Sequence, residues 1–319
     1  MTIKIKNSPA KKTFGSEITP MMAQYLKIKS DNRGSLLFYR MGDFYEIFFS
    51  DAEKASVALG ITLTHRGKHD GKPVPMCGVP VRSADLYLER LIRSGFHVAV
   101  CEQTEDPKVA KARGYKSIVS REVQRLVTPG TLTEENLLDM RSANYLIAVS
   151  YESSNLGIAW SDISTGEFSS TTCDLFLLGA LLVRLNPKEV LLPEDIFNEE
   201  DLRDVLVDWE NIISYQPTRL FDITAAKDRL TNLYGVAALD GFGTFTSVEL
   251  SAAGAIVEYI KITQKGKLPR LEVLNSILEK SSMIIDASTR KNLELTRSVS
   301  GTDEDTLLSV IDRTITGPG

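Results

Sequence analysis

The segment RMGDFYEIFF, residues 40–49, places an aromatic ring and a carboxylate two positions apart, directly after a turn. Side chains alternate along an extended chain, so Phe44 and Glu46 are predicted to point to one side and Tyr45 to the other. An aromatic ring can stack on a flat partner, and a carboxylate can accept hydrogen bonds from it. In an arbitrary Phe-x-Glu, however, the ring usually fills core and the carboxylate is solvated, so this pattern needs support from the rest of the chain.

Motifs for common enzyme chemistry are absent. His65, His69 and His97 fit no zinc-binding spacing. GKHDGKP, residues 67–73, is similar to a phosphate-binding loop, but its glycines enclose three residues instead of four. Pro73 also stands where Ser or Thr would hold magnesium. There is no G-x-S-x-G element and no dinucleotide fingerprint, so the motifs favour a binding protein over an enzyme.

Asp162 is the one carboxylate that suggests catalysis. It lies in GIAWSDISTGEF, where a strand, an aspartate and a hairpin are similar to the first catalytic strand of the ribonuclease H fold. Catalysis in that fold needs several acidic ligands around two metal ions, and the sequence offers no clear partners. A structural role in the hairpin is therefore favoured, and a metal-dependent nuclease built on Asp162 is the alternative.

The net charge of −5 conceals an asymmetry. Residues 1–128 hold 21 Lys+Arg and 13 Asp+Glu, a balance of +8, whereas residues 129–319 hold 16 and 29, a balance of −13. A basic segment followed by an acidic one suggests that the first segment meets a polyanion. From charge alone, contact with a polyanion and a chance distribution of charges are equally good explanations.

Cysteine usage and hydropathy favour a cytoplasmic protein without a membrane partner. Cys77, Cys101 and Cys173 lie far apart without metal-like spacing and are expected to be reduced core thiols. The longest apolar run, residues 175–183, is too short to cross a bilayer. The first residues are polar and lack the apolar stretch of a signal peptide.

The order of predicted elements indicates an α/β domain over the first part of the chain. Thr19-Pro20 is expected to start a helix that runs to about Ser30, and Ser50 with Glu53 fits a capping box for a second helix. Further elements are a strand at 35–42, a helix end near Gly60, a loop at 64–80, a helix from Ser83 to Gly95, and strands at 97–103 and 121–130.

From about residue 143 the pattern restarts. Strands are expected at 144–151 and 155–164 with a hairpin partner at 165–173, a helix at 174–186, a parallel-type strand at 189–193 and a helix at 252–264. Residues 266–270 are expected to be a linker. Two helices expected at 286–298 and 306–314 have no room to bury their apolar faces, so we expect the chain to be a fragment of a longer protein.

Taken in order, several motifs resemble one family closely. TPMMAQYLKIK, LLFYRMGDFYEIFFSDAEKAS, ITLTHRG, PVPMCGVP and RLVTPGT, followed by DISTGEF, LNPKEVLLPED and MIIDASTRKNLEL, resemble the N-terminal part of the MutS family of DNA mismatch-recognition proteins. The resemblance extends over nearly the whole chain. It implies an α/β fold in which a mixed-sheet α/β domain precedes a ribonuclease H-like α/β connector domain and the first helices of an all-α core.

The implied domain boundaries follow from this resemblance. Residues 1–18 are expected to be a flexible tail, 19–128 the mismatch-recognition domain, 129–282 the connector domain, and 283–319 the truncated start of the helical core.

The family's Phe-x-Glu motif falls on Phe44 and Glu46. A mismatched step unstacks more easily than a matched one, and an aromatic wedge entering from the minor groove can stack on one mispaired base. Glu46 is expected to hydrogen-bond that base and to repel the phosphates of matched duplex. Arg66 is expected to contact phosphate or sugar and Met76 to approach the minor groove, while His65 and Lys68 are weaker DNA-binding candidates. For these supporting residues a solvated loop is an equal alternative.

The resemblance also implies partners beyond DNA. In the full-length protein we expect a homodimer, a contact with MutL through the connector domain, and an ATPase that uses ATP and magnesium. We expect no cofactor, metal or catalytic residue in this fragment, because the nucleotide-binding part of the family lies beyond it. The implied connector is a structural and partner-binding module, which argues against a nuclease at Asp162.

Overall fold

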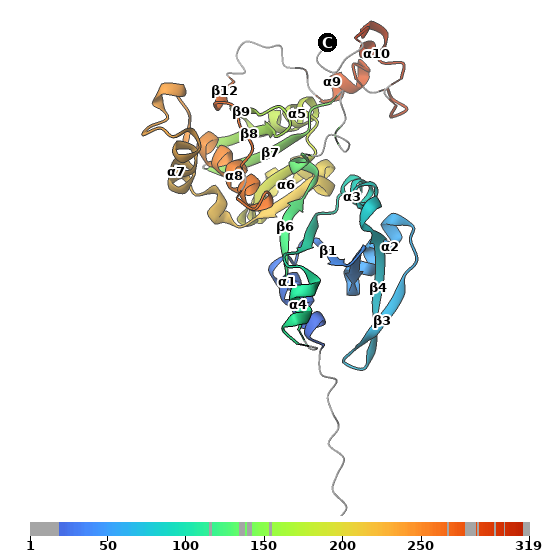
Figure 1. Cartoon of the computed structure of the whole chain (residues 1–319). Helices are drawn as coiled ribbons and strands as arrows, with labels where there is room; N and C mark the ends of the chain where they lie inside the picture. The colour runs from blue at the N-terminus through green and yellow to red at the C-terminus, as the bar shows by residue number, and fades with distance from the viewer. Residues whose placement is uncertain are drawn as a thin grey trace, which may run out of the picture. The chain divides into compact units, whose positions relative to one another are not determined.

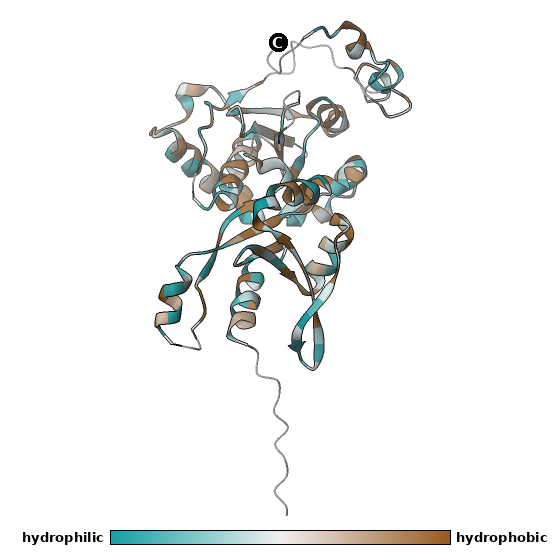
Figure 2. Cartoon of the chain, turned by 45° about the vertical axis from the view of Figure 1, so that its right-hand side comes forward, coloured by the Kyte–Doolittle hydropathy of each residue, from teal (hydrophilic) through white to brown (hydrophobic). Residues whose placement is uncertain are grey.

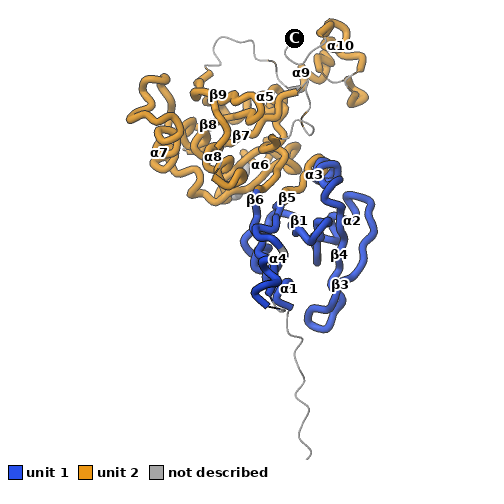
Figure 3. The backbone as a smooth tube through the Cα atoms, in the orientation of Figure 1, with its two compact units in different colours: residues 1–91, 99–124 blue, residues 92–98, 125–319 orange. Residues whose placement is uncertain are grey.

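The computed structural model describes residues 19–114, 117–133, 138, 142–152, 155–266, 268–277, 285, 287–296, 298–302 and 304–314. The expected tail at residues 1–18 lies outside them. The chain divides into two compact units, shown in Figure 3. Unit 1 comprises residues 1–91 and 99–124, and unit 2 comprises residues 92–98 and 125–319. Residues 92–98 therefore interrupt unit 1 in sequence but pack with unit 2, while the predicted four-part division of the chain stays a prediction.

Unit 1 contains a six-stranded sheet in the order β3-β4-β2-β1-β5-β6. Its strands are β1 Leu36–Met41, β2 Phe44–Phe48, β3 Thr64–His69, β4 Lys72–Pro80, β5 Val98–Gln103 and β6 Arg121–Val127. β1 with β2, β2 with β4 and β4 with β3 are antiparallel pairs. The predicted strands at 35–42 and 97–103 are confirmed, and the strand predicted within 121–130 ends at Val127, before a turn at Pro129–Thr131.

Unit 1 also contains helices α1 Pro20–Asp31, α2 Phe49–Leu59 and α4 Pro107–Ala112, and most of α3 Ala84–Arg93. Thr19 caps α1 as predicted, because its hydroxyl accepts a hydrogen bond from the amide of Met22. Tyr25 of α1 is buried and contacts Tyr39 and Phe48 edge-on, at centroid distances of 5.3 and 5.0 Å. These aromatic contacts join α1 to β2, which carries Phe44 and Glu46, and to its neighbour β1.

The predicted loop at 64–80 is wrong, because this segment is the β3–β4 hairpin. Asp70 and Gly71 have φ angles of +48° and +79°, as a two-residue type I′ turn requires. Three prolines argued against a strand, but Pro73 and Pro75 lie opposite β3 only and Pro80 ends β4. Pro73 and Pro75 have only β3 as a neighbour, because β2 pairs with residues 76–80 of β4. Proline, which has no amide donor, is tolerated at such positions and at a strand end.

The predicted start of the second helix is also wrong. α2 begins at Phe49 after an N-cap at Phe48, and no side chain caps it, so Ser50 and Glu53 form no capping box. Phe48 is fully buried and holds this end of the helix in the core. The predicted end is confirmed, since Gly60 closes the helix with a left-handed φ of +65°.

Unit 2 contains a second six-stranded sheet, in the order β11-β10-β7-β8-β9-β12. The strands are β7 Tyr145–Glu152, β8 Asn155–Asp162, β9 Glu167–Cys173, β10 Glu189–Pro193, β11 Ile213–Gln216 and β12 Asn275–Ser276. β7, β8 and β9 form an antiparallel meander, and β10 runs parallel to both β7 and β11. This mixed arrangement is the one expected of a ribonuclease H-like domain.

Helices cover both faces of this sheet, as Figure 1 shows. Leu146, Ala148 and Ala159 point to the face covered by α7 Ile223–Tyr234 and α8 Ser247–Thr263. Ile147, Val149 and Trp160 point to the face covered by α5 Leu175–Leu185 and α6 Glu200–Leu206. The two-residue alternation therefore supplies two separate cores.

Helix α8 is the central helix of unit 2 and begins earlier than predicted. Thr246 and Glu249 form a capping box there, a signal at 246–249 that the prediction of 252–264 overlooked. A Cβ added to Gly157 would lie 2.2 Å from the backbone of Val248, and one added to Gly254 would lie 2.3 Å from the Cβ of Ala226. Only glycine permits α8 to approach β8 and α7 this closely.

Two short helices follow: α9 Ala287–Asn292 and α10 Leu307–Ile311. Both are shorter than the helices predicted at 286–298 and 306–314. The apolar side chains of α10 are exposed, with Leu307 at 52% and Ile311 at 62%, which agrees with the lack of room predicted from the sequence. Over the described part of the chain, no helix is both long and apolar enough to cross a membrane.

Candidate nucleic-acid interface

Phe44 is the first residue of β2 and its side chain is 48% exposed. Gly42, with a φ of +62°, makes the turn that precedes it. Phe44 lies opposite Met41 on β1 and Pro80 on β4, so its backbone is held on both sides. The ring is thus an exposed aromatic group on a backbone fixed within a sheet.

Tyr45 points away from Phe44 and Glu46. It is buried on the opposite face, where its ring packs on Phe38 and its hydroxyl donates to Glu102. Burial, together with the hydrogen bond and charge of Glu102, raises the pKa of Tyr45 to about 12, against the opposing effect of Arg40. Because Tyr45 is anchored inside, the alternation predicted from the sequence is confirmed for this strand.

Glu46 lies opposite Gly78 of β4 and forms an ion pair with Arg66 of β3. Both carboxylate oxygens of Glu46 accept from the same Arg66 nitrogen, Nη1. The side chain of Glu46 is 13% exposed and that of Arg66 is 44% exposed. Glu46 and Arg66, which are 20 positions apart, therefore meet across the strand that separates them.

Gly78 forms the floor beneath the Phe-x-Glu pair. A Cβ there would lie 3.9 Å from Cγ of Glu46 and 4.0 Å from Cδ1 of Phe44. A longer side chain would occupy the space between the ring and the carboxylate. Gly78 is not among the site residues predicted from the sequence, although an isolated glycine in a strand is a known sign of close approach.

The supporting candidates lie on the β3–β4 hairpin, whose tip is coloured hydrophilic in Figure 2. Met76 is half-buried and lies two residues from Gly78, opposite Thr64. His65 and Lys68 are exposed on β3, on either side of an irregularity in the pairing. The structure thus brings Met76 and Arg66 to the strands that neighbour Phe44 and Glu46, and it spreads His65 and Lys68 along the outer strand.

Asp162 has a structural environment. It is buried, and its Oδ2 accepts from the amide of Asn144 at 2.9 Å while its Oδ1 accepts from the amide and hydroxyl of Ser164 at 2.9 and 2.6 Å. Among the residues that the structure describes, no three His, Cys, Asp or Glu side chains are grouped to hold a metal ion. This geometry gives the nuclease alternative no support.

Comparisons with known proteins identify two consecutive regions. MutS domain I matches residues 19–136, and MutS domain II matches residues 144–272. The chain is 56% identical over 302 residues to the DNA mismatch repair protein MutS of Dinoroseobacter shibae, 54% identical over 303 residues to that of Ruegeria pomeroyi, and 50% identical over 309 residues to that of Rhizobium meliloti.

Each of these alignments covers 95% of this chain and 34% of the relative, so the chain spans about a third of the length of these curated relatives. The two matched regions also agree with the two α/β sheets described above. The resemblance predicted from the motifs is confirmed: the chain belongs to the MutS family and carries its domains I and II.

Proposed function

We propose that this chain recognises mismatched or unpaired bases in duplex DNA, with Phe44 as the stacking wedge and Glu46 as the group that contacts the base. The observation that carries the proposal is the pairing of an exposed ring and a carboxylate over Gly78, on a strand held from both sides. Relatives that share half or more of its residues are named DNA mismatch repair proteins.

The energetics suit this assignment. Base–aromatic stacking contributes about 1–3 kcal/mol and tolerates any base, as a detector of many mismatches requires. Inserting a ring between base steps costs less where pairing is already weak. Phe44 needs little reorganisation before it binds, because its backbone already pairs with β1 and β4.

The hairpin supplies the proposed supporting contacts. Arg66 and Lys68 are cations on an exposed strand and suit phosphate oxygens. Met76 offers an apolar surface near Gly78, and His65 can donate to phosphate or sugar. Phosphate contacts carry no sequence information directly, so direct contact with the mispaired base is assigned to Phe44 and Glu46.

Competition between a duplex with one G·T mismatch and its matched control, at one stated salt concentration, tests the proposal. Phe44→Ala is expected to remove the preference for the mismatch. Phe176→Ala is the matched control, because Phe176 is 76% exposed on α5 of unit 2. The proposal fails if Phe44→Ala retains the wild-type preference, or if both variants lose it equally.

The other expected partners, MutL, a second subunit and ATP, belong to the full-length protein. From the resemblance, we propose a contact between unit 2 and MutL, a homodimer, and ATP with magnesium in the full-length protein, acting in the cytoplasm. The described residues of this chain do not fit a nucleotide phosphate loop, because GKHDGKP forms strands and the turn of the β3–β4 hairpin. We therefore assign ATP binding to the part of the relatives' length that this chain does not span.

A further inference from the structure

The ion pair between Glu46 and Arg66 joins the two charges that the proposed function assigns to different tasks. Both oxygens of Glu46 accept from Nη1 of Arg66. While this pair is intact, both oxygens of Glu46 are engaged, which leaves fewer lone pairs for a base, and the guanidinium is partly neutralised. A base and a phosphate therefore compete with this ion pair for Glu46 and Arg66.

The fold brings this pair together through two local features. Glu46 on β2 and Arg66 on β3 are separated by β4, and Gly78 opposite Glu46 leaves the surface of β4 without a side chain at that point. The pairing of β3 with β4 is irregular between His65 and Lys68, where Gly67 has a φ of +70°. Bulges of this kind redirect a side chain, here that of Arg66.

Because the ion pair reaches solvent through Arg66, DNA groups can replace its partners. Arg66 is 44% exposed, and ion pairs that water reaches contribute little stability. A duplex offers a stronger partner to each side: phosphate oxygens for Arg66 and a base N–H for Glu46. A matched duplex offers the phosphate but engages its Watson–Crick N–H groups in base pairs, whereas a mismatch can leave such an N–H free for Glu46, so a mismatch satisfies both residues better.

We propose that Arg66 is a specificity-determining residue that acts through Glu46. In DNA-free protein and on matched duplex, Glu46 holds Arg66 and withholds one cation from the phosphates. On a mismatch, Glu46 turns to the exposed base and Arg66 is released to bind a phosphate. The inference rests on the proposed function, since it requires that this face of unit 1 binds DNA.

A double-mutant cycle separates this mechanism from simple repulsion between Glu46 and phosphates. If Glu46 restrains Arg66, then Glu46→Gln releases one cation and adds about one phosphate contact on matched duplex. The slope of log K against log salt then steepens by about 0.9, so affinity falls about 3.5-fold more than wild type between about 50 and about 200 mM salt. In the Arg66→Gln background the same substitution should leave the slope unchanged.

Two further variants provide controls. Lys68→Gln removes a cation from the same exposed strand, and in that background Glu46→Gln should still steepen the slope. Arg66→Lys retains the charge and should retain the effect. Circular dichroism should show that each variant is folded at the temperature at which binding is measured.

The outcomes distinguish the inference from the proposed function. If Phe44→Ala removes the mismatch preference but Glu46→Gln steepens the salt slope equally with and without Arg66, repulsion is sufficient and the inference alone is overturned. If Glu46→Gln leaves the slope unchanged in the wild-type background, the inference is also overturned. If wild type shows no preference for mismatched duplex, both the proposed function and the inference fail.

Discussion

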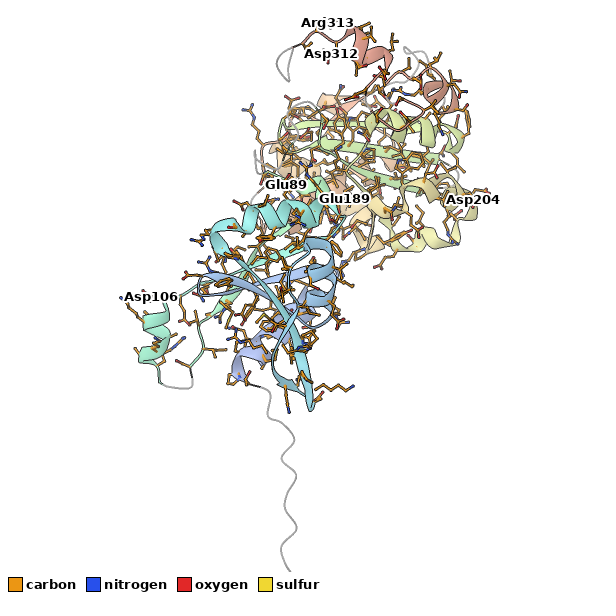
Figure 4. All side chains as sticks on the ribbon, turned by 90° about the vertical axis from the view of Figure 1, so that its right-hand side faces the viewer. Glu89, Asp106, Glu189, Asp204, Asp312 and Arg313 are labelled. Carbon is orange, nitrogen blue, oxygen red and sulfur yellow. The ribbon has the colours of Figure 1, made fainter. Side chains whose placement is uncertain are left out.

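His97 Nε2 lies 3.3 Å from Glu189 Oε1, inside unit 2. Glu189, labelled in Figure 4, is 1% exposed and also accepts hydrogen bonds from the hydroxyls of Thr128 and Tyr259 and the amide of Gly130, at 2.6, 2.5 and 3.0 Å. One buried carboxylate therefore ties together the segment 92–98, the turn at 129–131, β10 and α8. Four donors offset the cost of burying its charge.

This pair predicts a window of pH in which unit 2 is most stable. Burial by itself lowers the pKa of His97, but the hydrogen bond and charge of Glu189 outweigh it and the pKa lies above its ordinary 6.5. Burial by itself raises the pKa of Glu189, but His97 and the two hydroxyls outweigh it and the pKa lies below 4.5. The stabilisation from His97 is complete below pH 6.5 and lost as pH rises through its raised pKa. That from Glu189 is complete above pH 4.5 and lost as pH falls through its lowered pKa.

His97→Gln is therefore expected to lower the free energy of unfolding most between pH 4.5 and 6.5. The expected loss is about 1.5–3 kcal/mol, as is usual when a hydrogen bond between charged groups is removed. The difference from wild type should shrink on the alkaline side as wild-type His97 loses its proton. Urea unfolding across this range provides the measurement, with His65→Gln on the exposed strand β3 as the control. A difference that stays constant up to about pH 9 would contradict the role of the charged pair.

Local alternation is the feature of the fold that the sequence predicts best. It predicted β7, β8 and the shared direction of Phe44 and Glu46, opposite to Tyr45, because a two-residue period is a local property. Polar proline-rich composition hid the β3–β4 hairpin, although Asp70-Gly71 between two segments is a recognised hairpin signal. Here the strand pairing outweighed the low strand propensity of proline.

Contacts that depend on register could not be predicted in the same way. The ion pair of Glu46 with Arg66 requires β4 to lie between β2 and β3 and Gly78 to fall opposite Glu46. The contact of His97 with Glu189 joins residues 92 positions apart (189 − 97 = 92). No periodicity in either segment encodes such a partner, because long-range pairing is determined by the assembled sheet.

The packing of α7 against α8 predicts an unusual sensitivity to one methyl group. In Gly254→Ala the new Cβ would lie 2.3 Å from Cβ and 2.5 Å from Cα of Ala226, so the helices would have to separate. We expect a loss of about 1–3 kcal/mol in the free energy of unfolding. Gly241→Ala is the matched control, since no atom lies within 4 Å of its added Cβ. Equal unfolding midpoints for the two variants would refute this account of the helix contact.

The three cysteines are expected to react at different rates. Burial raises the pKa of Cys77 to about 11, and burial together with nearby carboxylates raises that of Cys101 to about 12, against the opposing charge of Arg121. Cys77 therefore has about one thiolate in a thousand at about pH 8 and Cys101 has fewer. Cys173 is only half-buried. Labelling with a disulfide reagent should show one fast and two slow thiols, and Cys173→Ser should remove the fast phase. Three equal rates in folded protein would contradict this assignment.

Substitution of Asp162 distinguishes a structural role of this residue from catalysis by a nuclease. Its carboxylate accepts from Asn144 and twice from Ser164, so Asp162→Ala would leave the amide of buried Asn144 without this acceptor and remove both bonds to Ser164 at the start of the β8–β9 turn. We expect this variant to lose about 1–3 kcal/mol of stability, because unsatisfied donors carry their full desolvation cost. Asp162→Asn keeps an acceptor oxygen and should lose less stability.

Neither substitution should alter the DNA products formed in magnesium, since wild type should cleave no duplex. Magnesium-dependent cleavage by wild type that Asp162→Asn abolishes, with its fold retained, would establish the nuclease instead.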